Sequence, residues 1–373
     1  MAPGSRAAKR VLSVAGSGEV WETTSKQDEG KAVMKASFLA TTTYAGPAPG
    51  GMTWPVPPVL CDRETAARTM RQTIESCRHA EALGFDWISL SEHHYAPMML
   101  TPNPLVMAGA LSQALKRCKI ALLGPLLPLA NPVRVAEEIA MLDAMTDGRV
   151  VVLFLRGTPN EHHTYGDVAA QSRAMTQEGI DLILKAWTTD EPFAWEGEHF
   201  QFPTVSVWPR TRQDPHPPVF GSGNSDESVV FAARRKLGMG MSFAAPPLIR
   251  HWVELYKSEA AKAGWTPTAE NILYRGTMHM AATEEETHRQ FTAATGRDAR
   301  TMPEPEGPLA YITRPYFFGA PDRVLEQVAV LRDCGVGIID MAFQLGVGHV
   351  NYEGQAAAME LFAKDVLPQI RDW

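Results

Sequence analysis

The feature that most constrains the fold of this chain is an alternation of short apolar runs with longer amphipathic segments. Eight apolar runs follow one another from about residue 36, and each has the length of a strand. The segments between them place apolar residues at helical spacing. Strands that alternate with helices form parallel sheets with crossover helices. The pattern therefore predicts an α/β fold, a closed eight-stranded β/α (TIM) barrel with insertions.

The element boundaries follow from the same pattern and from local turn and cap signals. Gly84 suits the left-handed position after a helix, and Asn131 followed by Pro132 suits a helix start. Residues 193–202, with Gly197 at their centre, predict a small hairpin outside the barrel. The predicted strands are residues 36–41, 87–90, 119–123, 150–155, 219–220, 239–243, 272–281 and 337–343. The predicted helices include residues 104–115, 174–187, 226–235, 249–263, 321–334 and 356–370.

Two segments do not follow this rhythm. Residues 1–33 are polar and without period, so we expect a disordered N-terminal extension before a single barrel domain at residues 34–373. Residues 295–319 are irregular and contain Arg297, Arg300 and Arg314. A loop of that length in a compact domain is typical of an active-site lid, which is what we expect here.

Composition excludes several classes of function. The chain is 45% hydrophobic, and its 35 Lys and Arg face 42 Asp and Glu, so its net charge of −7 disfavours nucleic-acid binding. No apolar run approaches the roughly 18 residues of a membrane span. The four cysteines are scattered, which fits neither a disulfide framework nor a zinc site. They are expected to be buried thiols in a reducing compartment, so we predict a cytoplasmic enzyme acting on small molecules.

Polar residues follow three of the predicted strands, at the end of a barrel where active sites form. These segments are residues 91–95 (SEHHY), 155–157 (LRG) and 221–226 (GSGNSD). Residues 221–226 begin a predicted helix and can present backbone N–H groups to a phosphate. The same residues would also fit an ordinary helix cap with no ligand. Arg156 at a buried strand end requires an anion. That anion is either the phosphate or a nearby carboxylate such as Glu161 or Asp167.

The histidines suggest acid–base chemistry first and a metal second. His93 can act as a general base, because an imidazole titrates near neutral pH. Residues 92–94 (EHH) and 161–163 (EHH) together contain enough ligands for zinc or iron. Adjacent strand residues point to opposite faces, however, so His93 and His94 would not share an ion. We therefore predict no metal site, and we interpret His94, His162 and His163 as packing or surface residues.

Four strings, in this order and spacing, resemble the bacterial luciferase-like flavin-dependent monooxygenase family. They are residues 81–86 (EALGFD), 91–95 (SEHHY), 127–134 (LPLANPVR) and 142–149 (LDAMTDGR). The resemblance covers residues 34–373 and is densest between residues 80 and 243.

That resemblance implies a flavoprotein that takes reduced FMN as a co-substrate from a separate flavin reductase, and that forms a homodimer or a heterodimer, of which we expect the homodimer. It implies a C4a-(hydro)peroxyflavin formed with dioxygen and stabilised by His93 as the catalytic residue. It assigns the FMN phosphate to Arg156 and Ser225. The further cofactor-binding residues that it implies are Glu92, Leu123, Gly124, Gly223 and Asn224. It also places a cis peptide bond between Leu123 and Gly124.

Leu155 stands where the luciferases proper have a reactive cysteine, so light emission is not expected. We predict instead an oxidoreductase that inserts one oxygen atom into a small organic substrate, in a pocket lined in part by Phe38, Tyr44, Met98 and Met99. The alternatives are a deazaflavin-dependent oxidoreductase of the same barrel family, a non-catalytic flavin-binding protein and a metal-dependent barrel hydrolase. The first of these transfers hydride without dioxygen.

Overall fold

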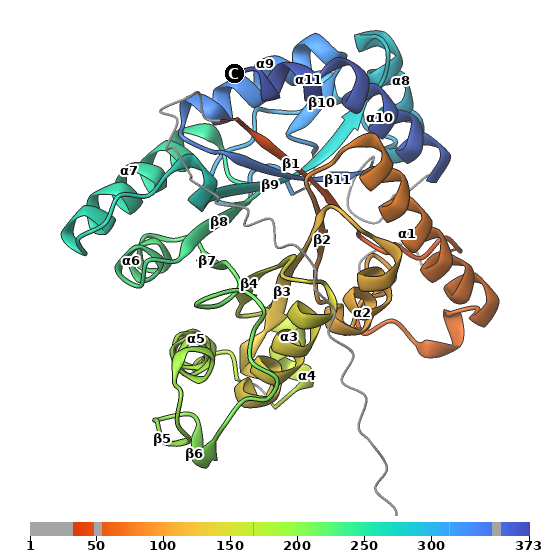
Figure 1. The fold of residues 1–373 in the computed structure, drawn as a ribbon. Coiled ribbons are helices and arrows are strands. Elements are labelled where there is room, and N and C mark those ends of the chain that lie inside the picture. The colour runs from red at the N-terminus through yellow and green to blue at the C-terminus, as the bar shows by residue number, and fades with distance from the viewer. Residues whose placement is uncertain (1–32, 48–53, 167, 313, 345–351) are drawn as a thin grey trace, which may run out of the picture. The chain divides into compact units, whose positions relative to one another are not determined.

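The computed structural model describes residues 33–47, 54–166, 168–312, 314–344 and 352–373 (Figure 1). The extension predicted for residues 1–33 lies outside these residues, apart from Val33.

Eight parallel strands close into a barrel, as the sequence predicts. Each strand pairs with the next in chain order, β8 pairs with β9, and β11 pairs back with β1 to complete the ring. Every strand lies at the predicted place to within a few residues. They are β1 (Lys35–Leu39), β2 (Trp87–Leu90), β3 (Lys119–Leu126), β4 (Val150–Leu155), β7 (Val219–Ser222), β8 (Gly238–Ser242), β9 (Ile272–Met280) and β11 (Ile338–Phe343).

Helices connect the strands and pack on the outer side of the ring (Figure 1). Asn131 accepts hydrogen bonds from the first N–H groups of its helix, and Gly84 adopts the left-handed conformation with φ +92°, so both predicted signals are confirmed. None of the described helices has the length and apolar character to cross a membrane. The main helices are α1 (Arg63–Leu83), α2 (Pro104–Ala114), α3 (Pro132–Met145), α5 (Ser172–Thr188), α6 (Asp226–Arg234), α7 (Pro246–Lys262), α9 (Pro321–Asp333), α10 (Tyr352–Asp365) and α11 (Leu367–Arg371).

The predicted hairpin is present as the antiparallel pair β5 (Phe193–Glu196) and β6 (Gln201–Val205). Three elements were not predicted: α4 (Pro159–Thr164), α8 (Glu284–Thr295) and β10 (Phe317–Gly319), which pairs with the end of β9. Helix α8 buries only Thr287 and Phe291, so its apolar periodicity is weak.

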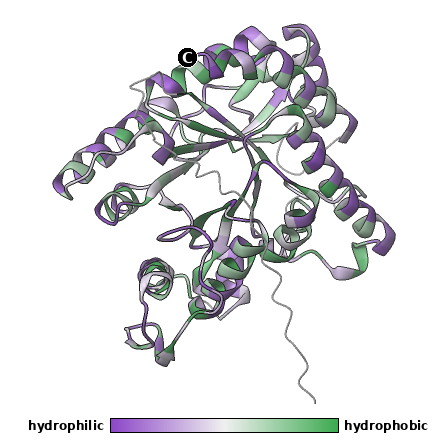
Figure 2. Cartoon of the chain, in the orientation of Figure 1, coloured by the Kyte–Doolittle hydropathy of each residue, from purple (hydrophilic) through white to green (hydrophobic). Residues whose placement is uncertain are grey.

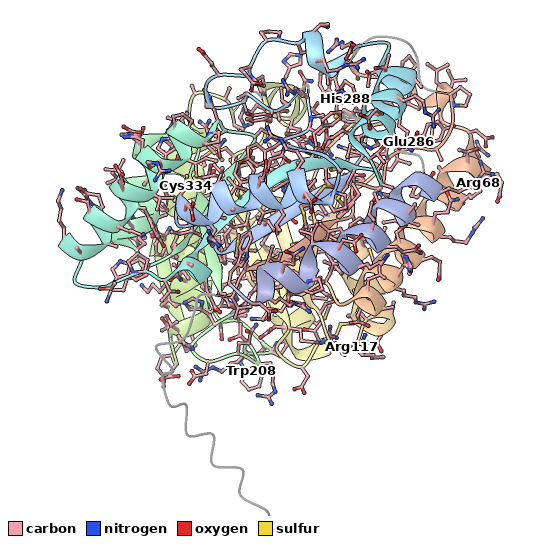
Figure 3. The ribbon with its side chains drawn as sticks, turned by 90° about the horizontal axis from the view of Figure 1, so that it is seen from above. Arg68, Arg117, Trp208, Glu286, His288 and Cys334 are labelled. Carbon is pink, nitrogen blue, oxygen red and sulfur yellow. The ribbon has the colours of Figure 1, made fainter. Side chains whose placement is uncertain are left out.

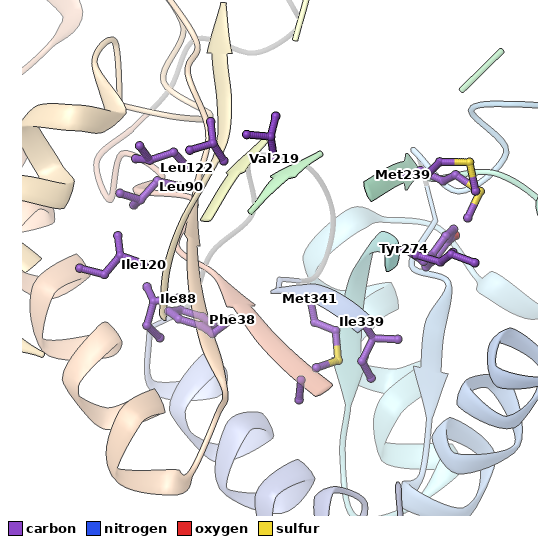
Figure 4. Close-up of a cluster of buried hydrophobic side chains, with 14 of the residues drawn as sticks. Phe38, Ile88, Leu90, Ile120, Leu122, Val219, Met239, Tyr274, Ile339 and Met341 are labelled. Atoms are coloured by element: carbon purple, nitrogen blue, oxygen red, sulfur yellow. The ribbon is translucent and has the colours of Figure 1, made fainter. Parts of the chain in front are cut away.

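The core has two layers, one inside the ring of strands and one between the ring and the helices. Figure 4 shows part of the outer layer, which includes Phe38, Ile88 and Tyr274, and Figure 2 shows hydrophilic residues along the helices outside it. Successive strand residues face opposite layers. The inner layer consists of Trp87, Ala121, Leu123, Val151, Leu153, Phe220, Leu273 and Ile338.

Two predictions about individual side chains were wrong. Phe38 packs in the outer layer, with its ring 6.4 Å from that of Phe85, because its neighbour Ser37 takes the inward position. It therefore does not line a pocket at the barrel mouth. Cys77, Cys118 and Cys334 are buried free thiols as expected, but Cys61 is exposed because it follows a short surface 3-10 helix.

Candidate functional site

A histidine–glutamate pair lies where β2 and β4 end. His93 Nδ1 is 2.9 Å from Glu161 Oε1, and the other carboxylate oxygen of Glu161 accepts the Thr158 N–H at 2.6 Å. Thr158 and Glu161 form a capping box that starts α4, and this turn holds the carboxylate in place. Burial raises the pKa of Glu161, but the hydrogen bonds from His93 and Thr158 outweigh it and leave the pKa below its ordinary value.

The pair determines which nitrogen of His93 is available for chemistry. An ionised carboxylate can only accept, so Nδ1 must carry the hydrogen. No described residue makes a hydrogen bond to Nε2, and about a third of the His93 side chain is exposed. His93 can therefore accept or donate a proton at Nε2 while Glu161 holds the ring in one tautomer and orientation.

The other histidines of the two EHH segments have structural contacts. His94 is buried, with Nε2 3.1 Å from Glu92 Oε1, and Glu92 Oε2 accepts the Leu126 N–H at 3.2 Å. His162 is also buried and bonds the Arg156 carbonyl at 2.6 Å, whereas His163 is exposed. Within the residues that the structure describes, no group of three or more His, Cys, Asp or Glu is placed to hold a metal ion.

A cluster of donors surrounds the first turn of α6. Ser225 is its N-cap, and the Ser225 hydroxyl lies 2.8 Å from that of Ser228 and 3.5 Å from Arg173 Nη1. Arg173 also pairs with Glu227 at 3.1 Å. A helix N-terminus with hydroxyls and a guanidinium beside it attracts an anion.

Arg156 has neither of the carboxylate partners considered above. Glu161 is bonded to His93, Asp167 lies outside the described residues, and the Arg156 guanidinium makes no hydrogen bond or ion pair with any residue that is described. Arg156 is exposed; partial desolvation lowers its pKa, the nearby positive charge of Arg173 lowers it further, and the Glu227 carboxylate opposes both effects. Arg156 and Arg173 thus form a cationic pair beside a helix N-terminus, next to one carboxylate, and such a pair can bind an anion.

The loop between β7 and α6 uses its own polar groups to hold β8. The Asn224 side chain accepts the Ser242 N–H at 2.9 Å and donates to the Ser242 carbonyl at 2.8 Å. Gly223 N–H donates to the Gly240 carbonyl at 2.7 Å, and a Cβ at Gly223 would come within 2.5 Å of Met239. The Asn224 amide is therefore already fully engaged, and a ligand at this loop would have to bind other groups.

The prediction of a cis peptide bond between Leu123 and Gly124 was wrong. Among the described residues the cis bonds are Trp54–Pro55, Trp208–Pro209 and Asp214–Pro215. The irregularity at this place is instead a register shift of β3 against β4 between Leu123 and Leu126. Gly124 is still required, because a Cβ there would lie 2.8 Å from the backbone of Ser91 and Glu92.

A buried ion pair, which the sequence analysis missed, lies beneath the barrel mouth. Arg275 Nε on β9 is 2.7 Å from Asp340 on β11, and Arg275 Nη1 donates to Ser91 Oγ at 2.7 Å. Ser37 and Ser89 donate to the same carboxylate at 2.7 and 2.6 Å. The sequence feature that could have indicated the pair is a charged residue within each of two mainly apolar strands, Arg275 in β9 and Asp340 in β11. Arg275 also lines a cavity of about 30 Å³, large enough for a water molecule, with residues that include Leu123, Ser222 and Asn224.

Two characterised relatives match about half of the chain. The alpha chain of alkanal monooxygenase from the Kryptophanaron alfredi symbiont is 30% identical over 200 residues, 53% of this chain and 52% of that protein. The oxygenase component of flavin-dependent trigonelline monooxygenase from Acinetobacter baylyi is 27% identical over 178 residues, 47% and 49% of the two chains. This chain thus spans about half the length of the curated relatives that it matches.

Solved structures share the fold over most of the chain. Monooxygenase RslO1 from Streptomyces bottropensis has a TM-score of 0.74 at 23% identity, covering 90% of this chain and 99% of that one. The oxygenating constituent of 3,6-diketocamphane monooxygenase from Pseudomonas putida, in complex with FMN, gives 0.71 at 20% identity over the same shares. An F420-dependent secondary alcohol dehydrogenase gives 0.67 at 17% identity, covering 91% and 99%.

Residues 52–337 match the family model described as luciferase-like monooxygenase, which is well over half of the chain. The chain therefore belongs to the luciferase-like monooxygenase family.

Proposed function

We propose that this protein binds reduced FMN at the C-terminal end of the barrel and uses it with dioxygen to insert one oxygen atom into a small organic substrate. The observation that carries the proposal is Arg156. Its guanidinium has no partner among the described residues and lies near Arg173, at the start of α6. An anionic group on a ligand would pair with Arg156 and lie close to Arg173, which already pairs with Glu227, and a phosphate is the group that helix N-termini favour.

The residues present fit FMN. Arg156, Arg173, Ser225 and Ser228 would hold its phosphate. Gly124 would support the site by letting the end of β3 pack against the backbone of Ser91 and Glu92. When bound, reduced FMN supplies the electrons with which dioxygen is activated.

The roles of His93 and Glu161 follow from their geometry. Nε2 of His93 would give or take a proton at the reacting centre, on the same end of the barrel as the phosphate site. Glu161 would act as a positioning residue, because its carboxylate reaches the ring only through Nδ1. Four further residues would line or support the cofactor site, mainly through their backbone: Glu92, Leu123, Gly223 and Asn224. The side chains of Glu92 and Asn224 already hydrogen-bond to other residues of the protein.

Part of the 295–319 segment is fastened near the same end of the barrel, which supports the proposal that it is a lid. Tyr311 N–H donates to the Phe243 carbonyl at 2.9 Å, and Ala245 N–H donates to the Gly307 carbonyl at 3.2 Å. Asn224 Nδ2 lies 3.4 Å from the Pro308 carbonyl. A segment held in this way would exclude water from the reacting centre.

The proposal extends to partners. The trigonelline enzyme is named as an oxygenase component, and we propose likewise that a separate reductase delivers reduced FMN to this protein. A homodimer and a cytoplasmic location stay predictions from the sequence.

The competing proposal is hydride transfer with a deazaflavin, because an F420-dependent dehydrogenase has the same fold. Reduced FMN or reduced F420 is bound to the protein without oxygen, and the complex is then mixed with oxygenated buffer while absorbance is recorded. We expect reduced FMN to bind and to react through a transient absorbance phase distinct from the reduced and oxidised spectra. Tight binding of F420 alone, with no dioxygen consumed, would favour the dehydrogenase.

A further inference from the structure

A second pocket, of about 520 Å³, lies among α8, α9 and the 295–319 segment. Its size is that of a site for a small organic molecule. None of His93, Arg156 and Ser225 lines it, so it is separate from the proposed flavin site. Its lining residues are Pro246, Glu284, His288, Ala299, Arg300, Met302, Glu304, Tyr311, Arg314, Pro315, Tyr316, Phe318, Arg323, Glu326, Gln327 and Val330.

Arg314 is the cation of this pocket that lacks a close counter-ion. Its side chain is only 19% exposed, and its Nε is buried with no hydrogen-bond partner. The nearest carboxylate is that of Glu304, which is 81% exposed and 3.8 Å from Nη1. An ion pair of this length to an exposed partner contributes little. A largely desolvated guanidinium in this state favours an anion that brings two oxygens to it.

The other charged side chains of the pocket already have partners. Arg300 pairs with Asp298 at 2.8 Å, and Arg323 pairs with Glu326 at 2.8 Å. Glu284 accepts the Ala320 N–H at 2.8 Å. An incoming anion would therefore bind Arg314. Among the described residues, Glu304 is the only ion-pair partner of Arg314 that the anion would displace.

The walls of the pocket suit a flat apolar body. Tyr311 and Tyr316 meet edge to face with ring centroids 4.9 Å apart, and Phe318 lies 5.0 Å from the His288 ring. Tyr316 and Phe318 are only 5% and 6% exposed, so the half-buried Tyr311 is the ring against which a flat ligand can pack. His288, which Figure 3 shows on α8, lines the pocket, and its Nδ1 is buried without a hydrogen-bond partner.

We infer that this pocket binds a small organic carboxylate with a flat apolar body, whose carboxylate pairs with the Nη groups of Arg314. The half-buried ring of Tyr311 favours this class over a free phosphate, which would leave the ring without contact. The inference does not depend on the flavin proposal, because it rests on a different set of residues.

The test is a calorimetric titration of the full chain with benzoate, with benzamide as the neutral isostere and inorganic phosphate as the bare anion. We expect saturable binding of benzoate at one site, at least tenfold tighter than that of benzamide or phosphate. Arg314→Gln should weaken benzoate binding at least tenfold. The matched control is Arg297→Gln, which removes an exposed arginine of the same segment outside the pocket and should leave binding unchanged.

A second variant keeps the test decisive if Arg314→Gln does not fold. Val330 lies at the pocket, is 41% exposed and can accept a larger side chain, so Val330→Phe should also abolish benzoate binding. The inference is overturned if wild-type protein does not bind benzoate, or binds benzamide equally well. Binding that survives both Arg314→Gln and Val330→Phe, or a preference for phosphate that Arg314→Gln removes, would likewise overturn it.

Discussion

At the scale of single residues, the chemistry depends on which nitrogen of His93 is available. The Glu161 carboxylate holds Nδ1 and leaves Nε2 unbonded by the described residues. Because Glu161 is itself held by the Thr158 N–H, the ring cannot turn without breaking its charge-assisted hydrogen bond to an anchored carboxylate.

We expect His93→Gln to slow the oxygen-dependent step by about 100-fold or more, the usual contribution of a general acid or base. Glu161→Gln should slow the same step less and change its pH dependence, since an amide can still accept from Nδ1 but supplies no charge. In both variants, the affinity for the reduced form of FMN, measured by anaerobic titration, should stay within about threefold of the wild-type value. The control is His163→Gln at the exposed neighbour. An equal loss of FMN affinity and rate would show that the histidine is structural.

Which residues lie at this end of the barrel could be predicted from sequence, but their hydrogen-bond and ion-pair partners could not. His93, Arg156 and Ser225 stand at strand ends, and that position alone marked them. Glu161 was considered only as an alternative partner of Arg156 and as a ligand in the metal site that we did not predict. It bonds His93 instead, because the capping box at Thr158 turns its carboxylate toward β2. Arg173 and Ser228 were missed because neither stands at a strand end.

At the scale of secondary-structure elements, one carboxylate joins the end of α1 to the start of β3. Glu81 accepts backbone N–H groups from Lys116, Arg117 and Cys118 at 2.9, 2.7 and 3.0 Å. Burial raises its pKa, but these three donors outweigh burial and lower the pKa from 4.5 to about 2. The carboxylate thus stabilises the loop only while it is ionised.

Glu81→Gln should lower the free energy of unfolding at pH 7 by about 1–3 kcal/mol, since buried N–H groups lose a charged acceptor. A depressed pKa gives stability that is present above pH 4.5 and is lost as pH falls toward 2. The difference in the free energy of unfolding between wild type and Glu81→Gln should therefore become smaller as the pH falls from 5 to 3. Urea unfolding at each pH measures it. A difference that stays constant over that range would contradict the assigned role. Glu75→Gln, an exposed change on the same helix, is the control.

Element positions were predictable where the local signal and the packing agree. Asn131, Pro132 and Gly84 mark ends of helices that also bury an apolar face. Helix α8 has a capping residue, Thr283, and three acidic residues in its first turn, but little apolar surface. A search that weighted caps above periodicity would have found it.

At the scale of the whole molecule, the barrel is closed around a charged pair rather than a purely apolar centre. Arg275 and Asp340 lie on adjacent strands in register, and the carboxylate also accepts from β1 and β2. The ion pair and its hydrogen bonds therefore connect four strands across the place where the ring closes.

Arg275→Met should lower the free energy of unfolding by about 3–5 kcal/mol, because Asp340 would remain buried without its cation. The double variant Arg275→Met/Asp340→Asn should recover part of that loss, and urea unfolding of both variants measures it. A single variant within about 1 kcal/mol of wild type would show that the pair is not needed for closure.

The alternation of apolar strands and amphipathic helices in the sequence predicted the barrel. A single charged residue within a strand, however, does not indicate which other strand contains its partner.

The flavin phosphate site proposed at Arg156 is tested most directly by anaerobic titration of wild type and Arg156→Ala with reduced FMN and with reduced riboflavin, which lacks the phosphate. We expect wild type to bind FMN at least tenfold more tightly than riboflavin, and Arg156→Ala to remove this preference while riboflavin affinity stays the same. A variant that keeps the preference, or loses affinity for both flavins equally, would contradict it.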